Sequence, residues 1–172
     1  MKFSLEIGPK TDLKTLPSVK DVYVTMLPGG DYKETAQQAV DLVKNGFNPI
    51  PHFPARSIDN DVQLKEYVSI CKDGGVNQAL VIGGSREPVG SFDSSIQLLE
   101  TGYFEDMKIG IAGHPEGSPD ISDSDLEKAM IDKKPYADYI VTQWLLDPQL
   151  IIDFISKQSV PVHVGITGPL KI

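Results

Sequence analysis

The sequence has one cysteine, no long apolar run and little positive charge. Cys71 alone excludes an intramolecular disulfide and a zinc site built on several cysteines. No apolar stretch approaches the roughly 20 residues of a membrane span, and Gly8 and Pro9 interrupt the N-terminus before a signal-peptide core develops. The formal net charge of -8 offers no basic surface to nucleic acid or anionic lipid. The composition predicts a cytoplasmic protein without nucleic-acid or membrane partners.

Short apolar runs alternate with segments of helical period along the chain. This pattern is typical of βα units around a parallel sheet. Strands are predicted at residues 3–7, 21–27, 47–53, 78–83, 108–112, 139–144 and 160–165. Helices are predicted at residues 32–45, 59–72, 94–100, 122–133 and 148–158, and a loop or a single turn at residues 9–20. No linker or low-complexity tract divides the chain, so we predict one domain over residues 1–172.

The predicted fold class is α/β, a (βα)8 TIM-type barrel with about seven strands. A complete barrel takes roughly 250 residues, whereas this sequence has 172 and places a glycine-rich loop after its seventh predicted strand. We therefore expect the barrel to lack its last unit. An unclosed sheet has an exposed edge, so either the chain is a fragment, or a homo-oligomer or a partner chain covers that edge.

Polar residues gather where the predicted strands end, which is where barrel enzymes place their active sites. They are Glu6, Thr25, His52, residues 83–87, residues 114–116 and Gln143. A carboxyl group at the mouth of an apolar barrel is partly desolvated, which raises its pKa and suits Glu6 to donate a proton. The alternative is a solvated residue or the salt-bridge partner of a lysine such as Lys10.

Histidine, glycine and cysteine give weaker signals. His52, His114 and His163 end strands and could converge on a metal, but the spacings of common metal sites are absent, so we predict none. A lone strand histidine is more often a hydrogen-bonded structural residue. Gly84 belongs to a glycine pair that lets backbone approach a ligand, without a phosphate-binding fingerprint. Cys71 is expected to be a buried structural thiol.

The order of several motifs resembles methylenetetrahydrofolate reductase. The matching stretches are residues 3–10 (FSLEIGPK), 22–25 (VYVT), 51–53 (PHF), 113–119 (GHPEGSP), 125–127 (DLE) and 137–143 (ADYIVTQ). The P-E-G-x-P and A-D-x-I-x-T-Q patterns are the specific ones. The resemblance implies a flavoprotein oxidoreductase of one-carbon metabolism and methionine biosynthesis. It would bind FAD, take hydride from NAD(P)H and reduce its folate substrate, 5,10-methylenetetrahydrofolate, to 5-methyltetrahydrofolate.

The resemblance also assigns roles to individual residues. Glu6 matches the catalytic glutamate that protonates the pterin side of the substrate, and Gln143 matches the glutamine that binds the pterin and the nicotinamide. The matched cofactor-binding positions are Thr25, His52, Gly84, Ser85, His114, Ser118 and Asp125. The sequence departs from the family where R-G-D is usual, because residues 83–85 read Gly-Gly-Ser.

Three other functions fit parts of the sequence. The lost R-G-D suits a flavin-poor or flavin-free folate-binding relative in one-carbon metabolism. The missing eighth unit suits a non-catalytic fragment that folds only with a partner chain. The strand-end histidines suit an unrelated barrel enzyme with a histidine-lined metal site.

Overall fold

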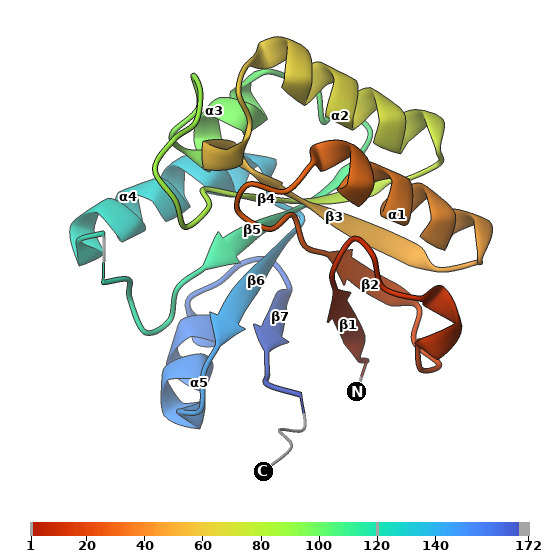
Figure 1. Ribbon diagram of the computed structural model, residues 1–172. Helices are drawn as coiled ribbons and strands as arrows, with labels where there is room; N and C mark the ends of the chain where they lie inside the picture. The colour runs from red at the N-terminus through yellow and green to blue at the C-terminus, as the bar shows by residue number, and fades with distance from the viewer. Residues whose placement is uncertain (1, 120, 169–172) are drawn as a thin grey trace. The chain divides into compact units, whose positions relative to one another are not determined.

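The computed structural model describes residues 2–119 and 121–168. They form two compact units, one up to Lys108 and one from Ile109 onward. Seven strands alternate with helices in the described residues, and within each unit every strand pairs in parallel with the next strand of the chain (Figure 1). The predicted βα alternation is confirmed. That residues 1–172 form a single domain stays a prediction.

Unit 1 carries four parallel strands in chain order with helices packed against them. Its strands are β1 (Ser4–Ile7), β2 (Asp21–Val24), β3 (Asn48–Pro54) and β4 (Gln78–Ile82). Its helices are η1 (Leu13–Thr15), α1 (Tyr32–Lys44), η2 (Ala55–Ser57), α2 (Asp61–Asp73) and α3 (Ser95–Glu100). α1 and α2 lie side by side (Figure 1). The short η1 confirms the single turn expected in the first connection.

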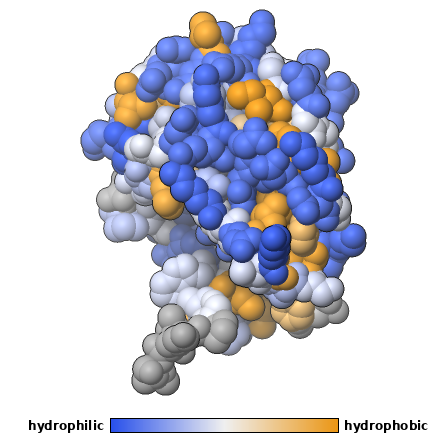
Figure 2. All heavy atoms as spheres, turned by 45° about the vertical axis from the view of Figure 1, so that its right-hand side comes forward, coloured by the Kyte–Doolittle hydropathy of each residue, from blue (hydrophilic) through white to orange (hydrophobic). Residues whose placement is uncertain are grey.

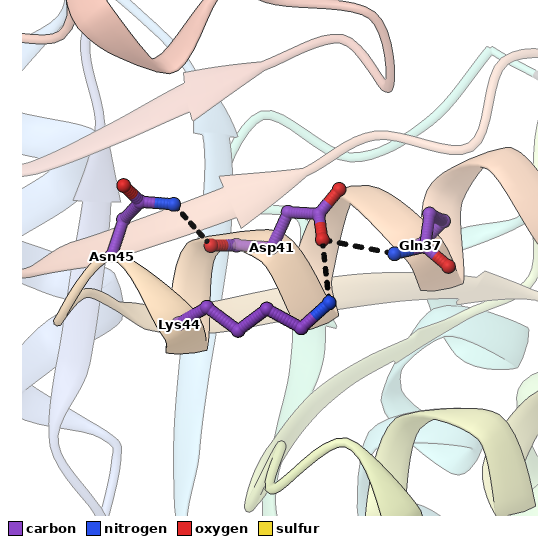
Figure 3. A network of polar contacts seen from close by, with 4 residues as sticks. All are labelled: Gln37, Asp41, Lys44 and Asn45. Carbon is purple, nitrogen blue, oxygen red and sulfur yellow. Dashed lines mark hydrogen bonds and ion pairs between the residues drawn. The ribbon is translucent and has the colours of Figure 1, made fainter.

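Polar side chains fix both ends of α1. At its start, the carboxylate of Asp31 accepts the backbone N–H of Lys33 at 2.8 Å, which satisfies one of the donors that a helix leaves unpaired. At its end, Asp41 accepts hydrogen bonds from Gln37 at 2.9 Å and Lys44 at 3.1 Å (Figure 3). The Asn45 amide donates to the carbonyl of Asp41 at 2.8 Å. The helix ends at Lys44, one residue before the predicted end.

The helix side of the unit 1 sheet holds its core. Phe53 stacks on Tyr67 of α2 with ring centroids 4.0 Å apart, and the Tyr67 hydroxyl donates to the carbonyl of His52 at 2.9 Å. Cys71 is fully buried, and burial raises the pKa of its thiol to about 12. The predicted structural thiol is confirmed. Because side chains alternate along a strand, His52 points to the face opposite Phe53.

Unit 2 repeats the plan with three parallel strands. Its elements are β5 (Lys108–Gly113), α4 (Asp123–Lys133), η3 (Lys134–Tyr136), β6 (Tyr139–Trp144), α5 (Pro148–Ser156) and β7 (Val162–Gly165). The ring of Tyr139 stacks on His163 with centroids 4.5 Å apart. Gly110 lies under that tyrosine, where a Cβ atom would stand 2.5 Å from the ring. The close packing of β5 on β6 therefore requires glycine at this position.

All the predicted strands and helices are present in the described residues. Their ends differ from the predicted ones by at most three residues, the largest shift being at β2, which ends at Val24 instead of Leu27. No helix among the described residues is long and apolar enough to cross a membrane. Hydrophilic residues cover most of the face in Figure 2, and hydrophobic residues form separate patches. The cytoplasmic location and the chain that would cover an open edge stay predictions.

Candidate functional site

In unit 1, Glu6 and His52 lie near each other at the carboxyl ends of β1 and β3. The register pairs Glu6 with Tyr23 and Tyr23 with Ile50, and His52 follows Ile50 by two residues on the same face. The carboxylate Oε2 of Glu6 lies 3.9 Å from Nε2 of His52. That distance is too long for a hydrogen bond, so the two groups face each other without bonding.

His52 is a buried, neutral imidazole. Its exposed fraction is 8%, and burial lowers its pKa from 6.5 to about 4. Tyr67 binds the backbone of His52, whereas the ring nitrogen Nε2 has no hydrogen-bond partner among the described residues. A buried polar atom without a partner costs about 1–3 kcal/mol. The ring is therefore poised to exchange a hydrogen bond with a bound molecule.

Glu6 is more open to solvent than the sequence suggested. Its side chain keeps 62% of its surface exposed, and partial burial raises its pKa above 4.5. The direction agrees with the expected proton donor. Lys10, the alternative partner, forms an ion pair with Glu34 at 2.9 Å instead. The role of Glu6 stays a prediction.

Three other predicted residues belong to the strand ends of unit 1. The Thr25 hydroxyl donates to the carbonyl of Ile7 at 3.0 Å and so ties the end of β2 to β1. Gly84 has a φ of 93°, and a Cβ there would stand 3.3 Å from that of Pro54. Glycine suits both the left-handed backbone and the close approach. Ser85 is exposed and follows it.

Two arginines of unit 1 lie beside this glycine loop. The backbone N–H of Arg56 donates to the carbonyl of Gly83 at 2.9 Å, and its guanidinium Nε donates to the carbonyl of Asp93 at 2.9 Å. Nη1 of Arg86 comes within 3.6 Å of where a Cβ of Gly29 would stand. Sequence reasoning missed Arg56. Its position four residues after His52, just past the strand, was the available signal.

In unit 2, the predicted residues have local partners. The carboxylate of Asp125 accepts the Ser122 hydroxyl at 2.6 Å, and its backbone N–H donates to that hydroxyl at 3.2 Å, which caps α4. Ser118 forms an isolated antiparallel bridge with Ile121. The amide of Gln143 reaches a carboxylate oxygen of Glu116 at 3.5 Å, the limit of a hydrogen bond. Each of these residues has a structural explanation without a ligand.

His114 lines a cleft of about 800 Å³ within unit 2. The cleft is bounded by the loop after β5 and by α4 and α5, and Lys133 contributes to its lining. Burial, and secondarily the charge of Lys133, lower the pKa of His114. The sequence did not predict this cleft. A lysine in the stripe that holds Leu126 and Met130 was the signal that could have drawn attention to α4.

No three histidine, cysteine, aspartate or glutamate side chains of the described residues lie close enough together to hold a metal ion. His52 contacts the ring of Tyr23 edge-on, and His163 stacks on Tyr139.

No protein-family model matches the chain. Among solved structures, a protein from Burkholderia cenocepacia J2315 provisionally described as a lyase/mutase superposes with a TM-score of 0.64 at 13% identity, covering 90% of this chain and 64% of that one. A provisionally described phosphonomutase from the same organism gives 0.64 at 12%, covering 95% and 77%. Oxaloacetate acetylhydrolase gives 0.62 at 11%, covering 84% and 58%. The chain thus spans less than two thirds of the first neighbour, and the likeness shows the fold.

These neighbours overturn the resemblance to methylenetetrahydrofolate reductase. The prediction of a flavin-dependent oxidoreductase using FAD and NAD(P)H in methionine biosynthesis is wrong, because the similar structures are described as a lyase/mutase, a phosphonomutase and an acetylhydrolase. The folate-binding alternative rested on the same motifs and loses its support. Those motifs are short, and Thr25, Ser118 and Asp125 are explained by strand pairing, a turn and a helix cap.

Proposed function

We propose that this chain carries the reacting residues of a lyase- or mutase-type enzyme that acts on a small 2-oxo carboxylate, and that its βα units belong to a TIM-type barrel. The sequential parallel strands and the solved neighbours support the fold. One neighbour acts, by its name, on oxaloacetate, a 2-oxo dicarboxylate. That compound sets the substrate class to test first.

The proposal rests on the buried Nε2 of His52, which has no hydrogen-bond partner in the described part of the chain and lies beside the carboxyl group of Glu6. Breaking a bond next to a carbonyl group leaves an enolate, whose oxygen needs a hydrogen-bond donor and whose carbon needs a proton. A neutral imidazole supplies an N–H to the oxygen without losing its proton. Glu6, whose pKa is raised, supplies the proton to carbon.

For the hydrolysis of oxaloacetate, atoms and electrons balance. Water adds to carbon 2 of oxaloacetate, the bond between carbons 2 and 3 breaks with its electron pair on carbon 3, and carbon 3 takes a proton. The products are oxalate and acetate. Arg56 and Arg86 beside the Gly84 loop provide positive charge for the substrate carboxylates.

The test is turnover of oxaloacetate, followed by proton NMR of released acetate, and turnover of phosphoenolpyruvate, followed by phosphorus NMR. Buffers with and without Mg²⁺ prevent a metal requirement from hiding activity. We expect Glu6→Gln and His52→Asn to lower kcat by about 10²-fold or more. Glu105→Gln, at an exposed carboxylate of the same unit, should leave it unchanged. Absence of turnover of both compounds, or full activity in Glu6→Gln, would refute the proposal.

A further inference from the structure

The cleft of unit 2 has a lysine at its most buried position. α4 and α5 line the cleft, and among their described residues Lys133 alone is buried, with an exposed fraction of 7%. Apolar residues of both helices stay partly open to solvent. Lys133 is thus more buried than the apolar residues of these helices, although lysine is almost never buried unless it is paired.

Lys133 has no anionic partner among the described residues. Its ammonium group reaches the carbonyl of Ala112 at 3.5 Å, the limit of a hydrogen bond, and forms no ion pair with a carboxylate of the described residues. An ammonium group has three donors, so at least two of them lack an acceptor in the part of the chain that the structure describes. Burying a charge without a partner is costly. An anion bound in the cleft would offset that cost.

The groups around Lys133 favour a particular kind of anion. His114 lines the same cleft, and burial, with the charge of Lys133 as the smaller cause, lowers its pKa. Together they offer two kinds of N–H donor at one place. Leu126 and Met130 from α4 and Phe154 from α5 supply apolar walls. The lining also holds carboxylates, so the anion is expected to lie on the side of Lys133 and His114, away from Glu116, Asp123 and Glu127. The volume of about 800 Å³ lies within the range of small-molecule sites.

We propose that this cleft binds a small amphipathic anion, with its phosphate or carboxylate group on Lys133 and His114 and an apolar or aromatic body between Met130 and Phe154. The site uses other residues than the reaction proposed above. Its test measures binding and not turnover, so either proposal can fail alone.

Phenyl phosphate is the probe, and phenol and inorganic phosphate are its neutral and headgroup-only counterparts. Each is titrated into the isotope-labelled full chain and followed by amide and methyl NMR shifts. We expect phenyl phosphate to bind more tightly than either counterpart and to shift signals of Ala112, Met130 and Phe154. Lys133→Met, which keeps the apolar stem, should weaken binding by about tenfold or more, as expected for loss of a charge-assisted hydrogen bond.

Lys128→Met is the matched control, because Lys128 lies on the same helix with its side chain 74% exposed. It should bind phenyl phosphate within about twofold of the parent chain. Three results overturn the proposal: phenyl phosphate binds no better than phenol, the shifted signals lie outside the cleft, or Lys133→Met binds as the parent does. If Lys133→Met does not fold, the first two comparisons, made on the unchanged chain, still decide.

Discussion

Replacing His52 by phenylalanine should stabilise the fold and make its stability less sensitive to acid. At pH 7 the substitution removes a buried ring nitrogen without a partner, whose burial costs about 1–3 kcal/mol. Strain from the slightly larger ring offsets part of this gain. We expect the free energy of unfolding to rise by about 1 kcal/mol.

At acid pH the difference in stability between the parent and the variant becomes larger. The unfolded chain binds a proton at His52 below pH 6.5, whereas the folded chain does so only near pH 4. The parent therefore loses stability as the pH falls from about 6.5 to 4, and the phenylalanine variant lacks this loss. By linkage the difference between the two proteins grows by about 2 kcal/mol between pH 7 and pH 5.

Urea unfolding followed by circular dichroism at both pH values measures this difference. The carboxylates of the chain titrate in both proteins, so their contributions to the change in stability with pH cancel in the comparison. Glu6 lies 3.9 Å from the ring, and repeating the pair in a Glu6→Gln background removes its contribution. A difference that is the same at pH 7 and pH 5 would show that His52 is not held neutral by burial. A variant less stable than the parent by more than about 1 kcal/mol at pH 7 would show that the ring nitrogen is satisfied.

Three further outcomes test the packing. Cys71, with a pKa raised to about 12, should not react with a thiol reagent at pH 8 until urea unfolds the chain, and rapid labelling of the native protein would contradict its burial. Gly110→Ala should cost about 1–3 kcal/mol, since its Cβ would stand 2.5 Å from the Tyr139 ring, and an unchanged urea midpoint would refute that contact. Asp31→Ala should cost about 1 kcal/mol by removing the acceptor of the Lys33 N–H, whereas Asp31→Asn, which retains a capping oxygen, should cost less.

The order of strands and helices was predictable because it depends on local periodicity. β6 was predicted with both its ends, and α1 to within one residue, since the alternation of apolar residues and the capping residues around Asp31 act over a few positions. Such signals do not depend on how distant segments pack.

The candidate site was predictable only in part. That Glu6 and His52 end strands follows from sequence, but their distance depends on the register of β1, β2 and β3. The cleft around Lys133 depends on how α4 and α5 pack in the folded unit, and local sequence patterns do not predict that packing. The failed family resemblance has a related cause, because a helix cap such as Asp125 and a strand tie such as Thr25 recur wherever the same local geometry is needed.

The stacking of Phe53 on Tyr67 has a consequence for the register that β3 adopts during folding. Neighbouring residues of β3 point to opposite faces of the sheet. A shift of one residue in the register of β3 would therefore move the phenyl ring of Phe53 and the imidazole of His52 to the opposite faces. The slipped chain would lose both the aromatic stack and the Tyr67 hydroxyl bond to the His52 carbonyl. The core contacts of Phe53 therefore also fix the position of His52. A chain that forms this core in the correct register places the histidine beside Glu6.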